Sequence, residues 1–244
     1  MSDIELLQSR TSGALSYVLP RNSSTMESLP SWLDPLVDCV HGVQVRDLTR
    51  FPPPAQGGRP SSVLILFGET DSQPDLLLIE RAHQMRSHSG QPAFPGGAVD
   101  ETDSGVVSAA LREAVEETGL DVSGVRPFAL LPDLFVPPSG FVVTPVLAWW
   151  QVPSPVGVVD PAEVAAVMRV PLAELIDPTH RVRVRHPSGY VGAGFTVADL
   201  IIWGFTGGLI DRLIALAGWE KPWDQSRIVD VDERLEVFDQ GPTA

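Results

Sequence analysis

The sequence predicts an α+β fold in which a mixed β-sheet carries helices on both of its faces. Apolar runs of strand length follow one another across short turns, which indicates β-hairpins. Helical segments separate some of the strands, but strand–helix–strand units are too few for a doubly wound parallel sheet. With 43% hydrophobic and 20% charged residues, the composition is typical of a globular domain with a sizeable core.

The 244 residues suit one domain with an extension at each end. Residues 1–30 are polar and rich in serine, and we interpret them as a leader without fixed structure. Met26 stands directly before a helix-like stretch, so residues 1–25 are expected to be dispensable for activity and stability. Residues 31–222 should form the domain, and residues 223–244 an acidic tail that is only partly ordered.

The first expected elements are a short helix and a hairpin. Residues 31–40 read as an amphipathic helix. Residues 51–60, with four prolines and two glycines, follow it as a loop. The apolar run 62–67 predicts a buried strand, and residues 75–80 predict its returning partner across a turn.

A longer helix is expected over residues 104–118, because Gly119 stands where a left-handed backbone commonly ends a helix. The later elements are recognised from apolar runs and from a proline at a helix start. They are strands at 125–131, 141–152 and 182–184, a short helix beginning near Asp160-Pro161, and a helix from about 196 to 216.

The chain is acidic, with 31 Asp and Glu against 17 Lys and Arg and a net charge of −14. General binding to nucleic acid depends on basic side chains that contact phosphates, so it is disfavoured. The lone Cys39 excludes an intramolecular disulfide and a cysteine metal cluster. No apolar run reaches about 18 residues, and residues 1–20 lack the apolar core of a signal peptide. We therefore expect a cytoplasmic protein with no nucleic-acid and no membrane partner.

Three glutamates lie on one face of the helix at 104–118. At about 100° per residue, Glu117 lies about 40° to one side of Glu113 and Glu116 about 60° to the other. The opposite face is mainly apolar, as expected for a helix with a buried side. Taken alone, three such glutamates are more typical of a solvated surface, because like charges at this spacing cost only about 0.2–0.5 kcal/mol.

The neighbours of these glutamates favour a metal site. Arg112 lies one turn before Glu116 and can orient its carboxylate. Gly96-Gly97 permits a loop to approach the helix closely, and Asp103 adds a carboxylate near the helix start. Carboxylate oxygens in such a cluster suit Mg²⁺ or Mn²⁺, which also leave coordination positions for water and phosphate.

The segment from Gly97 through Asp103 to Arg112-Glu113-Ala-Val-Glu116-Glu117-Thr-Gly119 resembles the Nudix box, G-x₅-E-x₇-R-E-U-x-E-E-x-G-U. Asp103 stands in place of a glutamate, and one extra residue separates it from the arginine. The resemblance implies a Nudix-like α/β/α sandwich with a catalytic loop–helix–loop. It also implies that Glu113, Glu116 and Glu117 bind the metal while Arg112 orients them. Which glutamate is the base stays open, with Glu113 one candidate.

Two further carboxylates are candidates for a metal ligand or base. Asp103 belongs to the box itself. In the family, a glutamate beyond the box can take this role, and Glu163 lies in a segment that fits. The alternative for Glu163 is the first turn of a helix, which favours acidic residues in any case.

The residues just before the box are similar to a second signature, that of the coenzyme A pyrophosphatases within the Nudix family. The segment runs Arg81-Ala-His-Gln-Met-Arg-Ser-His-Ser-Gly-Gln-Pro-Ala-Phe-Pro-Gly-Gly97. Arginines offer forked donors for phosphate oxygens. The resemblance implies that the substrate-binding residues are Arg81, Arg86, His88, Gln91, Phe94, Gly96 and Gly97.

This resemblance implies a Mg²⁺- or Mn²⁺-dependent enzyme that cleaves coenzyme A or its derivatives to 3′,5′-ADP and (acyl-)4′-phosphopantetheine. A homodimer is an open expectation. The alternatives are another nucleoside diphosphate derivative, such as ADP-ribose, a nucleoside triphosphate, or a Nudix fold that binds without catalysis. Three arginines that alternate along one strand would either contact the 3′-phosphate or face solvent: Arg181, Arg183 and Arg185.

Overall fold

The central sheet grows from the hairpin of β2 (Arg59–Thr70) and β3 (Gln73–Arg81), whose antiparallel pairing confirms the expected hairpin. The computed structural model describes residues 2–9, 13, 15–82, 90–137, 139–197 and 200–231. Strand β8 (Phe141–Trp150) lies beside β2 and runs parallel to it, whereas the other pairings of this sheet are antiparallel. The sheet is therefore mixed, as predicted.

Within the described part of the chain, nine strands belong to this sheet, in the order β1-β6-β8-β2-β3-β4 along its main path. Three more strands join it at the sides, where β5 pairs with β2, β7 with β8 and β9 with β3. The remaining bounds are β1 Tyr17–Val18, β4 Pro92–Ala93, β5 Gly96–Ala98, β6 Val125–Leu130, β7 Leu134–Val136 and β9 Val164–Pro171.

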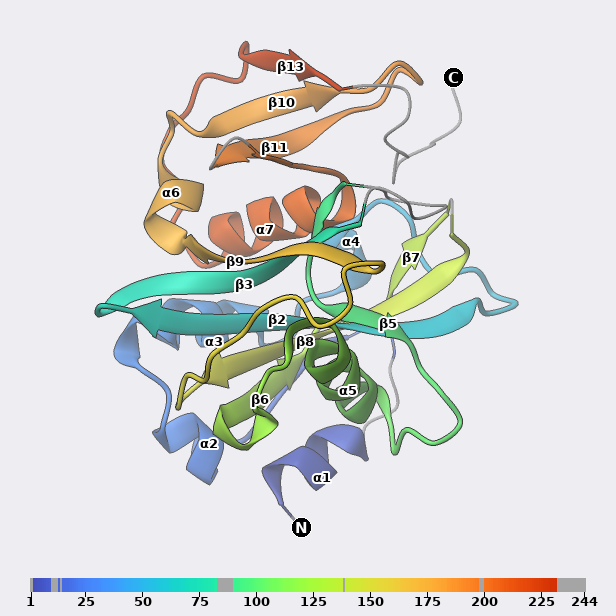
Figure 1. The fold of residues 1–244 in the computed structure, drawn as a ribbon, viewed down its shortest axis with the longest axis vertical. Helices are drawn as coiled ribbons and strands as arrows, with labels where there is room; N and C mark the ends of the chain where they lie inside the picture. The colour runs from blue at the N-terminus through green and yellow to red at the C-terminus, as the bar shows by residue number, and fades with distance from the viewer. Residues whose placement is uncertain are drawn as a thin grey trace.

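Helices cover both faces of the sheet. Helix α5 (Val106–Thr118) packs on β2 and β8, and Figure 1 shows it in front of the sheet with α3 (Asp34–Val40) behind. Helix α7 (Gly204–Leu216) packs against α3. The short helices are α1 Asp3–Gln8, α2 Ser24–Glu27, η1 Ser31–Leu33, α4 Val45–Leu48, η2 Val122–Gly124 and α6 Leu172–Ile176. No helix of the described residues is both long and apolar enough to cross a membrane.

The two faces of α5 differ as the helical spacing predicted. Val107, Ala110 and Ala114 are fully buried against the sheet. The helix ends at Gly119, whose φ of 69° is the left-handed conformation that glycine adopts without strain. The core face of the helix thus holds its opposite, acidic face in a defined position.

The C-terminal third departs from the prediction of one helix over 196–216. The first residues of that expected helix belong instead to the strands β11 (Val191–Val197) and β12 (Leu200–Ile202), which pair with each other. In the described residues, these strands complete a second sheet in the order β12-β11-β10-β13, with β10 at Arg181–Arg185 and β13 at Ile228–Asp230. The branched residues before Gly204 gain pairing partners in this sheet, which outweighs a weak helix preference. Helix α7 begins only at Gly204.

The expectation of a helix near Asp160-Pro161 is wrong. The described residues there form a turn, in which the backbone carbonyl of Asp160 accepts hydrogen bonds from the backbone N–H groups of Glu163 and Val164. The chain then enters β9, which pairs with β3. The proline therefore begins a turn rather than a helix, because the edge of β3 draws the next residues into a strand.

The interpretation of residues 1–30 as a leader without fixed structure is wrong for the part that the structure describes. Helix α1 begins with a capping box, in which the side chains of Ser2 and Glu5 each accept a hydrogen bond from the other residue's backbone N–H. Leu7 on this helix is fully buried in the main core, and strand β1 pairs with β6. At the other end, β13 lies parallel to β10, while residues 232–244 of the expected tail lie outside the described residues.

Candidate functional site

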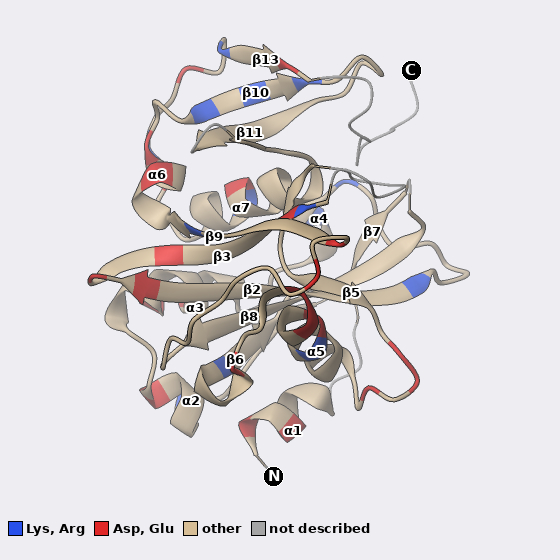
Figure 2. Cartoon of the chain, in the orientation of Figure 1, with Lys and Arg blue, Asp and Glu red and all other residues tan. Residues whose placement is uncertain are grey.

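A cavity of about 610 Å³ lies where α5, β5 and the start of α7 meet. Eight of the residues that the sequence predicts for the site line it. These are Arg81, Gln91, Phe94, Gly96, Gly97, Glu113, Glu117 and Glu163. Figure 2 shows the acidic and basic residues of α5 near the centre of the molecule.

Glu117 is the most deeply buried carboxylate of this cavity, with 6% of the residue exposed. It accepts a hydrogen bond from the backbone N–H of Gly96 at 3.0 Å. The Nη1 atom of Arg81 lies 3.9 Å from the Oε1 atom of Glu117. Burial raises the pKa of Glu117 to about 7, because these contacts only partly compensate for the lost hydration of the charged form.

The two glycines of β5 allow the strand to lie against the sheet and α5. A Cβ on Gly96 would lie 2.3 Å from the carbonyl oxygen of Ser62, and one on Gly97 would lie 2.4 Å from the Glu113 Oε1. Neither position has room for a side chain in this arrangement. The absence of side chains is what lets the backbone N–H of Gly96 reach Glu117.

Glu113 faces both the cavity and Arg112. Its Oε1 accepts a hydrogen bond from Arg112 Nη1 at 3.0 Å. Burial nevertheless raises the pKa of Glu113, so the arginine does not fully offset the desolvation of the carboxylate. Glu113 and Glu117 are therefore two partly buried carboxylates at one cavity.

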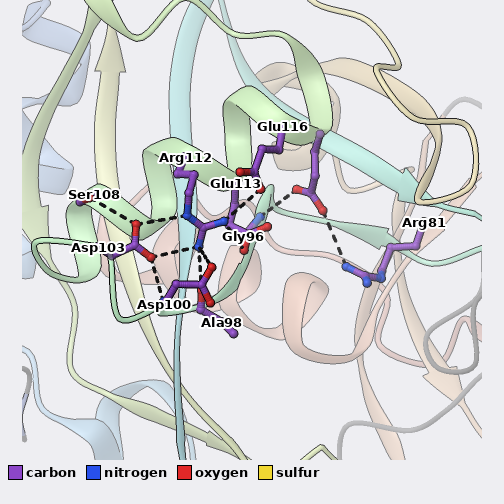
Figure 3. A network of polar contacts seen from close by, with 10 residues as sticks. Arg81, Gly96, Ala98, Asp100, Asp103, Ser108, Arg112, Glu113 and Glu116 are labelled. Carbon is purple, nitrogen blue, oxygen red and sulfur yellow. Dashed lines mark hydrogen bonds and ion pairs between the residues drawn. The ribbon is translucent and has the colours of Figure 1, made fainter.

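Arg112 is the centre of a polar network beside the cavity (Figure 3). Its Nε and Nη2 donate to the two oxygens of Asp103 at 3.1 and 3.0 Å, and its Nη2 also donates to the carbonyl oxygen of Ala98 at 3.0 Å. The hydrogen bonds to Asp103 raise the pKa of Arg112 and hold the pKa of Asp103 below its usual range. The network joins the loop of Asp103, β5 and α5.

Asp103 and Glu116 both turn toward Arg112. Asp103 also accepts from the backbone N–H of Asp100 at 2.9 Å, so both its oxygens are engaged. Glu116 accepts from Arg112 Nη1 at 3.0 Å, and its side chain is 55% exposed. Neither residue lines the cavity, whereas Glu163, which precedes β9, does.

The segment before the box is partly outside the described residues. Arg86 and His88 fall within residues 83–89, so their expected roles stay predictions. Phe94 is 3% exposed and belongs to the main core as well as to the cavity wall. Gln91 also lines the cavity, and its backbone carbonyl accepts from the N–H of Arg81.

Several cavity residues were not assigned to the site from the sequence. Trp203, Phe205 and Thr206 come from the start of α7 and contribute to the same lining as the box residues. The Ile-Trp-Gly-x-Thr pattern at 202–206 is a signal that could have identified them. Arg59, whose guanidinium lies 4.1 Å from the ring centre of Phe141, had no comparable signal.

The donors at this cavity fit a hard divalent cation in their chemistry. Among the described residues, no three acidic, histidine or cysteine side chains already converge closely enough to hold a metal ion. However, Glu113 and Glu117 both present carboxylate oxygens to this cavity, and burial raises the pKa of each. Carboxylate oxygens are the hard ligands that Mg²⁺ and Mn²⁺ bind.

The chain is similar in sequence to known proteins. A family model described as NUDIX domain matches residues 58–188. A relative from Cronobacter sakazakii, described as an uncharacterized Nudix hydrolase NudL, is 39% identical over 165 residues, which cover 62% of this chain and 78% of the relative. The protein of the same description from Enterobacter sp. is 37% identical over 175 residues, covering 66% and 83%. Among solved structures, the Nudix hydrolase RenU from M. smegmatis aligns with 18% identity and a TM-score of 0.46, over 71% of this chain and 97% of that one.

Proposed function

The chain belongs to the Nudix family of hydrolases, which act on diphosphate bonds in nucleoside diphosphate derivatives, and we propose that its substrate is coenzyme A or one of its derivatives. The reaction is hydrolysis of the diphosphate, which releases 3′,5′-ADP and 4′-phosphopantetheine or its acyl form. Water supplies the oxygen of the new phosphate group, so the two products carry all the atoms of substrate and water.

One observation carries the proposal. Arg81 comes from the segment similar to the coenzyme A pyrophosphatase signature, and Glu117 comes from the box. Their side chains lie 3.9 Å apart in one cavity. An arginine at that position can donate to a diphosphate that lies beside the carboxylates, which supports diphosphate hydrolysis at this place.

We propose that Glu113, Glu116 and Glu117 would hold Mg²⁺ or Mn²⁺; Glu113 and Glu117 line the cavity, and Arg112 Nη1 joins the carboxylates of Glu113 and Glu116. When bound, such an ion neutralises the charge that develops on the diphosphate and lowers the pKa of the attacking water. Glu117 would hold the ion in its charged form and would therefore have to release the proton that burial favours.

We propose that the other residues of the site position the carboxylates, supply the base or shape the substrate pocket. Asp103 anchors Arg112, and Arg112 orients Glu113 and Glu116; the engaged oxygens of Asp103 favour this role over that of a base. Glu113 and Glu163 line the cavity and are the candidates for the base. Gln91 and Phe94 shape the wall beside Arg81.

A substrate panel tests the proposal. The full chain with Mg²⁺ or Mn²⁺ is incubated with coenzyme A, an acyl-coenzyme A, ADP-ribose and nucleoside triphosphates, and the products are separated by chromatography. We expect the highest kcat/KM for a coenzyme A form, with 3′,5′-ADP as a product. Faster cleavage of ADP-ribose or a triphosphate would assign another substrate, and no cleavage of any member would leave a binding protein.

Two further expectations accompany this proposal. A cytoplasmic location fits a coenzyme A substrate, and a homodimer is tested by light scattering of the purified chain. We expect a mass of twice 26.3 kDa, and a mass of one chain would contradict the dimer.

A further inference from the structure

A second cavity adjoins the first. It has a volume of about 350 Å³ and lies between α4, β11 and the first turns of α7. Phe205 lines both cavities, so one substrate can extend from the carboxylates past this ring. Both volumes are large enough for parts of a small-molecule ligand.

The second cavity is rich in arginine although the chain is acidic. Arg46, Arg50 and Arg212 contribute to its lining. Within the described part of the chain, neither Arg46 nor Arg212 forms a salt bridge. Asp211 is the one acidic residue among the described lining residues; its carboxylate pairs with the buried Arg181 and also feels the charge of Arg212. The described lining of this cavity therefore holds more basic than acidic side chains.

The walls of this cavity are apolar and partly aromatic. Phe51, Tyr190 and Phe205 contribute rings, and the guanidinium of Arg50 lies 5.1 Å from the ring centre of Phe51. Gly208 on α7 leaves open space, since a Cβ there would meet nothing within 4 Å. Flat rings accept a nucleobase by stacking, and arginine forks accept phosphate oxygens.

We infer that the second cavity binds the nucleoside end of the substrate and that Arg46 and Arg212 bind a phosphate monoester on its ribose. The inference rests on the proposed function, because coenzyme A carries such a phosphate. Two of the three arginines that the sequence suggested for this contact have other partners. Arg181 is fully buried and paired with Asp211, and Arg185 pairs with Asp230 at 2.7 Å.

The first experiment measures binding without turnover. Titration calorimetry in EDTA compares adenosine 3′,5′-bisphosphate with adenosine 5′-monophosphate on the full chain. The wild type should bind the bisphosphate at least about tenfold more tightly, and the double variant Arg46→Ala/Arg212→Ala should lose that preference while it keeps its affinity for the monophosphate. The control Arg21→Ala/Arg126→Ala removes the same charge near α2 and β6 and should keep the preference. Equal affinities in the wild type, or an unchanged preference in the double variant, would overturn the inference.

A second variant tests the cavity by volume rather than charge. Gly208→Leu places a side chain into the open space from a position inside a helix, where leucine is a better helix former than glycine. We expect both nucleotides to bind at least about tenfold more weakly, because the base loses its place. Unchanged affinity for both would show that the nucleoside lies elsewhere.

These results separate the inference from the proposed function. If coenzyme A is hydrolysed but the double variant keeps its preference for the bisphosphate, the reaction stands and the cavity assignment fails. If no coenzyme A form is cleaved but the preference depends on Arg46 and Arg212, the cavity assignment stands and the proposed reaction fails.

Discussion

Arg112 and Asp103 form a two-pronged ion pair, with Nε donating to Oδ1 at 3.1 Å and Nη2 donating to Oδ2 at 3.0 Å. The carboxylate side chain of Asp103 is 3% exposed, so the pair is shielded from water on one side. This contact connects the loop before α5 to the residue that orients Glu113 and Glu116. Asp103, which stands where the usual box has a glutamate, is thus the residue that anchors Arg112.

Asp103→Ala should lower both stability and activity. It leaves Arg112 without its main partner, and hydrogen bonds to charged groups contribute about 1.5–3 kcal/mol. We expect a loss of about that size in urea denaturation and a fall in kcat. The matched control is Asp100→Ala, which removes a carboxylate that is 61% exposed and 3.6 Å from Arg112; a loss of at most about 1 kcal/mol is expected there. Equal losses in the two variants would contradict the anchoring role.

Gly97→Ala and Gly96→Ala should separate activity from stability. The Cβ at position 97 meets the carboxylate of Glu113, the far end of a flexible side chain, which can move away. We expect nearly unchanged stability but a strongly reduced kcat. The Cβ at position 96 meets the backbone oxygen of Ser62, which cannot yield without disturbing the sheet. Thermal unfolding should show a marked loss for Gly96→Ala, and similar melting temperatures for both variants would count against this account.

Glu116→Gln should lower turnover by orders of magnitude without unfolding the protein. The side chain is 55% exposed, so replacing its carboxylate by an amide should leave the fold intact. An amide is a far weaker ligand for Mg²⁺ than a carboxylate, which removes part of the proposed metal site. Steady-state kinetics and circular dichroism are the measurements, and turnover like that of the wild type would remove the metal assignment.

Glu117 should make the metal-free protein less stable as pH rises. Its pKa is about 7 when folded and near the ordinary value of 4.5 when unfolded, so the folded state binds the extra proton between these values. Below about pH 4.5, Glu117 is protonated in both the folded and the unfolded chain and does not change the free energy of unfolding. Between about pH 4.5 and pH 7, the charged form costs the folded protein increasing stability, up to on the order of 3 kcal/mol. In EDTA, Glu117→Gln should therefore exceed the wild type in stability at pH 8 and match it near pH 4.5. A difference that does not depend on pH would contradict the raised pKa.

The raised pKa of Glu117 also predicts how Mg²⁺ changes the melting temperature at different pH values. Ligand binding to the charged carboxylate competes with its protonation, so Mg²⁺ should raise the melting temperature more at pH 8 than at pH 5.5. Glu117→Gln should reduce that difference. An equal shift at both pH values would place the bound ion away from Glu117.

Leu7→Ala should destabilise the protein by about 2–5 kcal/mol, because Leu7 is fully buried and its truncation leaves a cavity in the core. Ile4→Ala, on the same helix but 36% exposed, should cost much less. Removal of residues 1–25 should cost at least as much as Leu7→Ala, since it also removes β1. Full stability of the shortened chain would restore the interpretation of this segment as a dispensable leader.

Local patterns were sufficient for the elements whose neighbours in sequence are also their neighbours in space. The hairpin of β2 and β3 and the helix α5 with Gly119 at its end depend on strand alternation, helical spacing and a single glycine. The same spacing placed the three glutamates on one face. Residues 200–202 were misassigned because their preference is weak and a partner strand decides their conformation.

By itself, the sequence determined the mixed α+β architecture, the acidic helix and the family to which the chain belongs. All three depend on the spacing of residues that are close to one another in the sequence. Only the tertiary structure decided that Glu117 is buried beside Arg81 while Glu116 and Asp103 turn to Arg112, and that Leu7 belongs to the core. The physical reason is that burial and ion pairing depend on which distant segments meet. Helical spacing assigns a carboxylate to a face, but the packing of β5 and β3 against that face determines how much water and positive charge it retains.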